Sequence, residues 1–329
     1  MRKRITWLDD MRGFMIIWVV MCHSLVLNQN LGIQGHIDAS LLYVINLFIM
    51  PCFFAISGFL YHRVRSWQQY KTVWSKKGVG LMVPYLIFSV ILHVYMHSPD
   101  PWWSIGYQPI FLMWFLYALF FIFIIVSTLD WLRVSPRFQL VAYLIAMLIQ
   151  TRLHWFDGPD YDMNPISCIL GYLIFFYGGF LIKRYYQDFK AVFSRKRVIG
   201  SLWMILAVGT CIQAGYTGIF PYNTDGVQLS DFLMKMISVL AFFSLFMTAS
   251  GLHLDGLNLM GKNTLVVYLV HYLVLHSVFI WIMTDTVIHS PLLQSGLRFV
   301  SGVLGSLIVV WLVKHVKFLA FWFYPRKFI

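Results

Sequence analysis

The sequence predicts an all-α, polytopic integral membrane protein, and three observations carry that prediction. First, 60% of the residues are hydrophobic and only 12% are charged, whereas a soluble domain carries about 25% charged residues. Second, apolar runs long enough to cross a bilayer recur from one end of the chain to the other. Third, basic residues gather in every second connection between these runs. We expect a single transmembrane domain over residues 1–329, with no separate soluble domain.

The apolar runs predict about ten transmembrane helices. Most of them approach the ~20 residues that a helix needs to span a bilayer. The fifth run is short for a full crossing, so we expect it either to tilt little or to be shielded by its neighbours. The predicted spans are residues 13–29, 42–61, 79–97, 109–129, 138–152, 166–183, 198–216, 231–250, 263–284 and 292–314.

The positions of the basic residues predict the orientation of the chain. Most of the 25 lysines and arginines precede the first span, follow the last one or lie in alternate connections. Lys71, Lys76 and Lys77, for example, fall in the connection expected between the second and third spans. Because basic residues stay on the cytoplasmic side of a membrane protein, both termini are expected in the cytoplasm. The net charge of +12 therefore requires no nucleic acid partner.

The first span contains the residues that point most directly to chemistry. Arg12 and His23 are eleven residues apart, so on a helix they share one face and are separated by about 16 Å along the axis. An interfacial arginine and a histidine bonded to a neighbouring helix would explain each residue alone, but not the shared face. An ionisable side chain as deep as His23 is a functional candidate. Asp9 is placed to pair with Arg12, and the alternative is that Asp9 or Asp10 caps the helix.

Two other segments contain candidate residues near the expected cytoplasmic side. Ser57 and Gly58 lie within a span, where small residues permit close helix packing or leave room for a ligand. Lys76 and Lys77 precede the third span. They could hold phosphates as point charges, and lysines that set orientation are the alternative.

The ninth span begins with polar residues and contains two histidines. Asn263 or Thr264 is expected to cap this helix. His271 lies within its first turns, and His276 follows five residues later, which is about 140° around the helix. At most one of these histidines can therefore face a site shared with His23.

The connections expected on the outer side are rich in aspartate and aromatic residues. The densest segment is 155–164, which includes Asp157 and Asp160. A belt of interfacial aromatic residues explains most of the rings. The alternative is a carbohydrate-binding surface, in which rings stack on sugars and carboxylates bind hydroxyl groups.

These motifs, in their order and spacing, resemble the membrane acyltransferase family 3 and, within it, the fucose 4-O-acetylase-like branch. The chain departs from the family in one place. Many members carry an arginine pair before the proline of the third helix, whereas here the basic pair is Lys76 and Lys77, and Gly80 and Leu81 occupy the nearer position. The matching residues are Asp9, Arg12, Gly13 and His23; Phe53, Phe54 and Ser57 to Leu60; Trp114 to Leu116; and Gly261 to Leu265 with Tyr268, Leu269 and His271.

The resemblance implies a membrane O-acyltransferase that moves an acetyl group from cytoplasmic acetyl-CoA to a hydroxyl of a cell-surface or lipid-linked carbohydrate. It implies a multi-pass protein of the bacterial cytoplasmic membrane, with acetyl-CoA as co-substrate and no metal. The residues assigned to catalysis are His23, Arg12, Asp9 and His271; those assigned to the donor are Arg12, Lys76, Lys77 and Ser57; those assigned to the acceptor are Trp114, Asn263, Asp157 and Asp160.

Three alternatives stay open at this point. The chain could be a transporter, although no repeat between its halves is visible. It could be a non-catalytic subunit of a polysaccharide export system, or an enzyme of the same fold that transfers succinyl. Within the acyltransferase reading, His23 either takes the proton itself or holds another group, such as His271, in place.

Overall fold

The computed structural model describes residues 5–30, 36–110, 112–152, 164–217, 229–252, 254–284 and 290–328. The structure is 86% helix and its described residues contain no strand, which confirms the all-α class. Eight helical stretches of these residues are long and apolar enough to cross a membrane. They are Thr6–Leu27, Ser40–Phe59, Trp67–Tyr95, Trp114–Trp131, Pro165–Arg184, Leu229–Thr248, Thr264–Trp281 and Leu292–His315.

Two predicted spans are helices outside that set of eight. α7 (Pro136–Arg152) covers the fifth predicted span, and its apolar part, Pro136–Gln150, is shorter than a full crossing, as the sequence predicted. α10 (Lys196–Thr217) covers the seventh. Helices therefore occupy all ten predicted segments, and a polytopic membrane protein is the architecture that they support. The cytoplasmic location of both termini stays a prediction.

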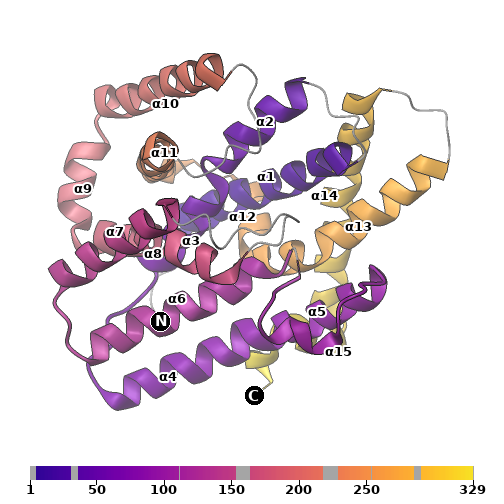
Figure 1. Cartoon of the computed structure of the whole chain (residues 1–329), viewed down its shortest axis with the longest axis horizontal. Coiled ribbons are helices and arrows are strands. Elements are labelled where there is room, and N and C mark those ends of the chain that lie inside the picture. The colour runs from indigo at the N-terminus through magenta and orange to yellow at the C-terminus, as the bar shows by residue number, and fades with distance from the viewer. Residues whose placement is uncertain are drawn as a thin grey trace. The chain divides into compact units, whose positions relative to one another are not determined.

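Figure 1 shows the helices in their order along the chain. The remaining elements are α1 (Thr6–Asn30), α2 (His36–Asn46), α3 (Ile49–Phe59), α4 (Trp67–Lys77), the π-helical turn η1 (Gly78–Met82), α5 (Val83–Tyr95), the short helix η2 (Trp102–Gly106), α6 (Trp114–Trp131), α8 (Pro165–Arg184), α9 (Tyr186–Phe193), α11 (Leu229–Thr248), η4 (Ala249–Gly251), α12 (Asp255–Lys262), α13 (Thr264–Thr284), α14 (Pro291–His315), α15 (Lys317–Phe323) and η5 (Pro325–Lys327).

The chain folds into two compact units, each assembled from two separate stretches of sequence. Unit 1 comprises Met1–Ile56 and Leu181–Leu312, and unit 2 comprises Ser57–Phe180 and Val313–Ile329. The single transmembrane domain expected from the sequence stays a prediction.

Helix α1 is the central element of unit 1 and contacts α2, α11, α12 and α13. The ring of Phe14, on α1, lies within 6.3 Å of four other aromatic rings, measured between ring centroids. All four pairs are tilted, at centroid distances in the range that aromatic pairs favour. They place the beginning of α1 in a packed apolar core. The partner rings are Trp18, Phe48, Phe242 and Phe246.

Two glycines allow α1 and α12 to touch through their backbones. A Cβ atom at Gly13 would lie 1.9 Å from the carbonyl oxygen of Leu257, and one at Gly261 would lie 1.7 Å from that of Asp9. No other residue fits at either position without moving a backbone. The sequence prediction placed residues 251–262 in a connection and missed α12, a short helix whose buried residues are Met260 and Gly261.

Helix α1 also begins earlier than predicted, at Thr6 instead of residue 13. The expectation that Asp9 or Asp10 caps the helix is therefore wrong, because both lie inside it and are buried. Helix α12 packs against this first part of α1 and buries its polar residues. The helix can therefore begin before the apolar run from which the sequence prediction started.

The second predicted span, residues 42–61, is broken in the structure into α2 and α3 by a turn at Leu47 and Phe48. The reason is Pro51, which has no N–H to donate to the carbonyl of residue 47. The hydroxyl of Ser238 on α11 lies 2.7 Å from that carbonyl oxygen and also 2.7 Å from the Lys235 carbonyl. A side chain from another helix thus replaces the backbone hydrogen bond that proline removes.

In unit 2, the third predicted span begins earlier than the sequence suggested. Residues 67–95 form one helical stretch in which α4, η1 and α5 follow without a break. Ser66 caps it by accepting a hydrogen bond from the N–H of Gln69. Lys71, Lys76 and Lys77 therefore lie on a helix, and their placement in a loop is corrected. Their segment contains no Pro or Gly, so nothing in it stops the helix.

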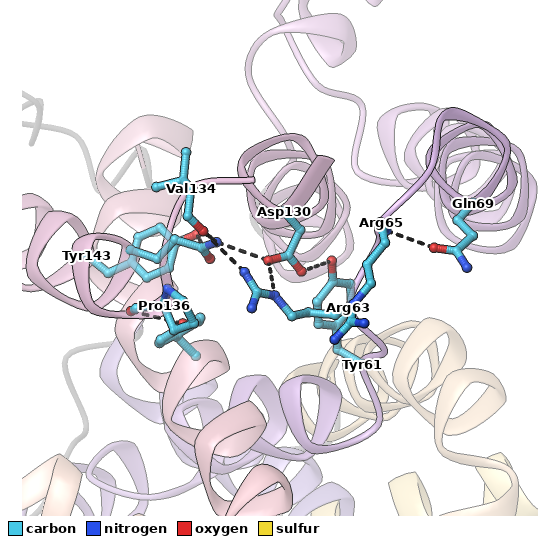
Figure 2. A network of polar contacts seen from close by, with 10 residues as sticks. Tyr61, Arg63, Arg65, Gln69, Asp130, Val134, Pro136 and Tyr143 are labelled. Atoms are coloured by element: carbon cyan, nitrogen blue, oxygen red, sulfur yellow. Dashed lines mark hydrogen bonds and ion pairs between the residues drawn. The ribbon is translucent and has the colours of Figure 1, made fainter. Parts of the chain in front are cut away.

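A buried carboxylate joins three segments of unit 2, and Figure 2 shows its contacts. Asp130, near the end of α6, accepts hydrogen bonds from Arg63 Nε at 2.7 Å, Tyr61 Oη at 2.9 Å and Gln139 Nε2 at 3.0 Å. Arg63 also donates to the Val134 carbonyl at 3.2 Å. Burial, followed by the charge of Asp130, raises the pKa of Tyr61, so its hydroxyl keeps the proton that it donates.

Substituting Gly261 by alanine should destabilise the protein by about 3 kcal/mol, because the new methyl group collides with the α1 backbone. The measurement is the melting temperature of the purified protein in detergent. Gly256→Ala on the same helix is the matched control, since a Cβ there meets no atom within 4 Å, and it should leave the melting temperature equal or higher. Equal melting temperatures for the two variants would contradict the backbone contact.

Removing the Asp130 carboxylate should also destabilise the protein by about 3 kcal/mol, because Arg63, Tyr61 and Gln139 lose their shared acceptor. Asp130→Ala is compared with Asp100→Ala, which removes an exposed aspartate. We expect a lower melting temperature for the first variant only. A wild-type value for Asp130→Ala would show that the network does not hold these segments together.

Candidate active site

The first turns of α1 carry three charged residues that the packing against α12 fixes in place. Arg12 Nη1 donates to Asp9 Oδ1 at 3.5 Å, which is the pairing that the spacing predicted. Asp10 accepts a hydrogen bond from Asn258 Nδ2 of α12 at 3.0 Å. The Asp9 side chain is buried, whereas 28% of the Arg12 side chain is exposed. The partly exposed guanidinium of Arg12 is thus hydrogen-bonded to the buried carboxylate of Asp9.

His23 and His271 meet where α1 packs against α13. Their ring centroids are 5.0 Å apart, and His271 Nε2 lies 3.3 Å from His23 Nδ1. Helix α1 is continuous from Thr6 to Asn30, so Arg12 and His23 keep the shared face that the sequence predicted. Of the histidines on α13, His271 faces His23, whereas His276 stacks on Tyr272. The prediction that at most one of them does so is confirmed.

The hydrogen bonds assign the protons of this histidine pair. His271 Nδ1 lies 3.0 Å from the Val267 carbonyl oxygen, and His23 Nδ1 lies 2.9 Å from that of Val19. A carbonyl oxygen can only accept, so both Nδ1 atoms carry a hydrogen. His271 Nε2 then accepts a share of the hydrogen on His23 Nδ1. In the neutral pair, this leaves Nε2 of His23 as the nitrogen that can take a proton from another molecule.

The two histidines differ in how much of each side chain can be reached. His271 is fully buried, while His23 is partly exposed within the described structure. A group that exchanges protons with a substrate has to be accessible, and a group that orients it does not. The geometry therefore supports His23 as the base and His271 as the residue that holds its ring.

A buried cation lies on the neighbouring helix α14. Gly302 lets α14 approach α1 and α13, because a Cβ there would lie 2.8 Å from both Val20 and Leu275. Arg298, one turn away, is fully buried, with its guanidinium carbon 5.6 Å from the centroid of the Phe279 ring. A guanidinium at this depth is a donor of the kind that stabilises an oxyanion. The sequence reasoning passed over Arg298, although a charge inside a span is itself a signal.

Asn263 lies at the junction of α12 and α13. Its Nδ2 donates to the Leu259 carbonyl at 2.7 Å, and the Thr264 hydroxyl donates to the Gly261 carbonyl at 2.8 Å. The hydrogen bonds of both side chains therefore run back to α12, which corrects the expectation that one of them caps α13. The carbonyls at the end of α12 need donors, and these side chains supply them.

The other predicted residues with described positions lie in unit 2. Gly58 has a packing role, since a Cβ there would lie 1.7 Å from the Phe176 carbonyl oxygen, and Ser57 precedes it on α3. Lys77 Nζ lies 3.5 Å from the centroid of the Phe123 ring, and Lys76 is exposed. Trp114 is buried, with its ring centroid 5.5 Å from that of Tyr172.

Two predicted acceptor residues, Asp157 and Asp160, lie outside the described residues. Within the described ranges, no group of three or more His, Cys or Asp side chains is arranged to hold a metal ion.

Together, the membrane helices and the contact between His23 and His271 define a polytopic membrane protein with two histidines paired between its helices. Residues 5–315 match the family model described as an acyltransferase domain, and the chain belongs to acyltransferase family 3. It is accordingly a membrane acyltransferase. No curated protein and no solved structure matches the chain.

Replacing each histidine separately should distinguish the base from the residue that orients it. His23→Ala should lower kcat by about 10²–10⁴-fold, because the proton acceptor is lost. His271→Ala should cost about tenfold in kcat with little change in KM, because the base remains but its ring is less well held. The assay is acyl transfer by the purified protein.

His276→Ala is the matched control, as it removes a histidine of α13 that stacks on Tyr272, and it should keep wild-type activity. A His271→Ala protein that is folded and more impaired than His23→Ala would reverse the two roles.

Proposed function

We propose that this acyltransferase moves an acetyl group from cytoplasmic acetyl-CoA to a hydroxyl of a cell-surface or lipid-linked carbohydrate. The observation that carries the proposal is the contact between His271 Nε2 and His23 Nδ1, which leaves His23 Nε2 as a proton acceptor within the membrane helices. Acyl transfer to a hydroxyl needs such a base, and imidazole is the usual one near neutral pH.

In the proposed reaction, His23 Nε2 removes the proton of the acceptor hydroxyl as the oxygen attacks the thioester carbonyl carbon. The carbon–sulfur bond then breaks, and the thiolate of coenzyme A takes the proton back from the imidazolium. The products are the O-acetyl ester and free coenzyme A, so His23 is unchanged after each cycle.

The donor is an anion on the cytoplasmic side, and Arg12 is the cation best placed to meet it. Arg12 lies on the same α1 face as His23, about 16 Å away along the helix, and its guanidinium is steadied by Asp9. A pantetheine arm along this face would carry the thioester from Arg12 to His23. Lys76, Lys77 and Ser57 are proposed to contact the donor from α3 and α4.

The acceptor is proposed to approach from the outer side, where Asp157 and Asp160 are candidates for binding its hydroxyl groups. Trp114 and Asn263 have less support in this role. Trp114 packs against Tyr172 inside unit 2, and Asn263 bonds to α12. The fucose 4-O-acetylase-like branch and the bacterial cytoplasmic membrane are part of the same proposal, because they rest on the sequence resemblance.

The test is incubation of the purified protein in lipid nanodiscs with radiolabelled acetyl-CoA and a lipid-linked or polymeric glycan. We expect release of the coenzyme A thiol together with label on the glycan, and neither product with His23→Ala. Succinyl-CoA in place of acetyl-CoA tests the alternative acyl group.

Three controls complete this experiment. The melting temperature of His23→Ala establishes that the variant is folded. Comparison of surface-glycan acetylation in cells with and without the gene identifies the acceptor. A wild-type protein that binds glycan but releases no thiol from any acyl-CoA would contradict the proposed reaction and would point to a transporter or an assembly subunit.

A further inference from the structure

The segment after α14 returns to unit 2 and docks against the π-helical turn η1. Phe323 of α15 packs on Phe88 of α5 with ring centroids 5.0 Å apart, and Pro325 of η5 is buried. The turn η5 contacts η1. Residues 325–327 thus have a defined place beside the helix that carries Lys76 and Lys77.

The contact between the two turns depends on a glycine and an arginine. A Cβ atom at Gly80 would lie 3.0 Å from Arg326 Cδ and 3.9 Å from its Nη1. The Arg326 side chain therefore occupies the space into which a side chain at position 80 would project. The position is also unusual in its backbone, because π-helical turns inside α-helices are rare and occur frequently at functional sites.

Basic residues outnumber carboxylates in the described part of unit 2. Lys76 lies four residues before Gly80 on the same continuous helix, and both Lys76 and Arg326 are exposed. The carboxylates in the described part of unit 2 are Asp100 and Asp130, and Asp130 is buried and bonded to Arg63, Tyr61 and Gln139. Among the described residues, the Arg326 guanidinium has neither an ion pair nor a hydrogen bond to a protein acceptor.

The neighbouring side chains do not supply a negative charge either. Burial raises the pKa of Tyr324, so its phenol stays neutral, and Lys327 Nζ lies 4.5 Å from the centroid of that ring. Lys77 is held over Phe123. Arg326 thus lies against the glycine of η1, Lys76 precedes that turn on the same continuous helix, and neither cation is ion-paired with a carboxylate of the described part of unit 2.

We propose that Arg326 and Lys76 form a phosphate-binding site at η1, and that it receives a phosphate group of the coenzyme A donor. This inference rests on the proposed function and adds Arg326 to the donor site. A planar guanidinium binds a phosphate through two parallel hydrogen bonds, whereas an ammonium acts as a point charge. A phosphate lipid headgroup has the same chemistry, so the experiment separates the two sources.

The experiment measures the affinity of coenzyme A for the full-length protein in phosphatidylcholine nanodiscs. Arg326→Ala should weaken binding by about tenfold or more, as expected for the loss of a charge-assisted hydrogen bond. Arg326→Lys should be intermediate. Arg137→Ala is the matched control, since it removes an exposed cation from the start of α7, and it should bind as the wild type does.

A second-site variant tests the geometry independently of folding effects. Gly80→Arg alone should weaken binding, because its Cβ crowds Arg326. Gly80→Arg combined with Arg326→Ala should restore most of the affinity, because a guanidinium again occupies the space beside η1. Failure of the double variant to bind better than Arg326→Ala, with an unchanged melting temperature, would overturn the placement of the site.

The outcomes also separate this inference from the proposed function. If the wild type and Arg326→Ala bind coenzyme A equally, the inference is overturned while the acetyl-CoA reaction stands. If the wild type does not bind coenzyme A, the proposed donor is wrong and this assignment falls with it. The same measurement in phosphatidylglycerol nanodiscs identifies a headgroup site. If Arg326→Ala changes only the difference in coenzyme A affinity between the two lipids, and leaves the affinity in phosphatidylcholine unchanged, the site binds a headgroup and the assignment to the donor is overturned.

Discussion

The backbone contact between α1 and α12 is the constraint on which the candidate active site depends. Gly13 and Gly261 each bring a carbonyl oxygen of the other helix to within 2 Å of where a Cβ would be. That contact fixes the beginning of α1, and with it the Asp9–Arg12 pair and the bond from Asn258 to Asp10. Because α1 is one continuous helix, fixing its beginning also fixes the rotation that turns His23 toward His271. The geometry of the candidate site is therefore set by two glycines, Gly13 and Gly261.

The two glycines of this contact lie in the sequence motifs from which the candidate site in unit 1 was predicted. Gly13 and Gly261 belong to the two motifs that were recognised beside Arg12 and His271, and the structure shows that they are packing partners. The helical class, the position of each apolar segment, the Asp9–Arg12 pair and the single histidine facing His23 all follow from helical periodicity. These are local properties, or properties of one helix face, and sequence reasoning handles them well.

Most of the parts that were missed depend on contacts between distant segments. Helix α12 is too short and too polar to stand out as an apolar run, and its packing on α1 is what buries it. The early start of the third span has a different, local origin, since the connection before it is polar but contains no residue that would stop a helix. Arg298 was visible as a charge in a span, but only the packing of Gly302 against Val20 and Leu275 relates it to the histidine pair. At position 80 the chain has a glycine near the place where many family members carry an arginine. The sequence alone gives no reason for that glycine, whereas the structure places the Arg326 side chain beside it.

The composition of unit 2 from two stretches of sequence has a consequence for how the protein is made. Residues 57–180 leave the ribosome well before residues 313–329, with most of unit 1 synthesised in between. The turn η1 therefore exists in the nascent chain without its partner η5, and Phe88 without Phe323. Contacts between segments this far apart in the chain form late, since the entropy of closing the intervening loop has to be overcome first. Completion of unit 2 is accordingly a step that follows translation, and insertion of α14 precedes it.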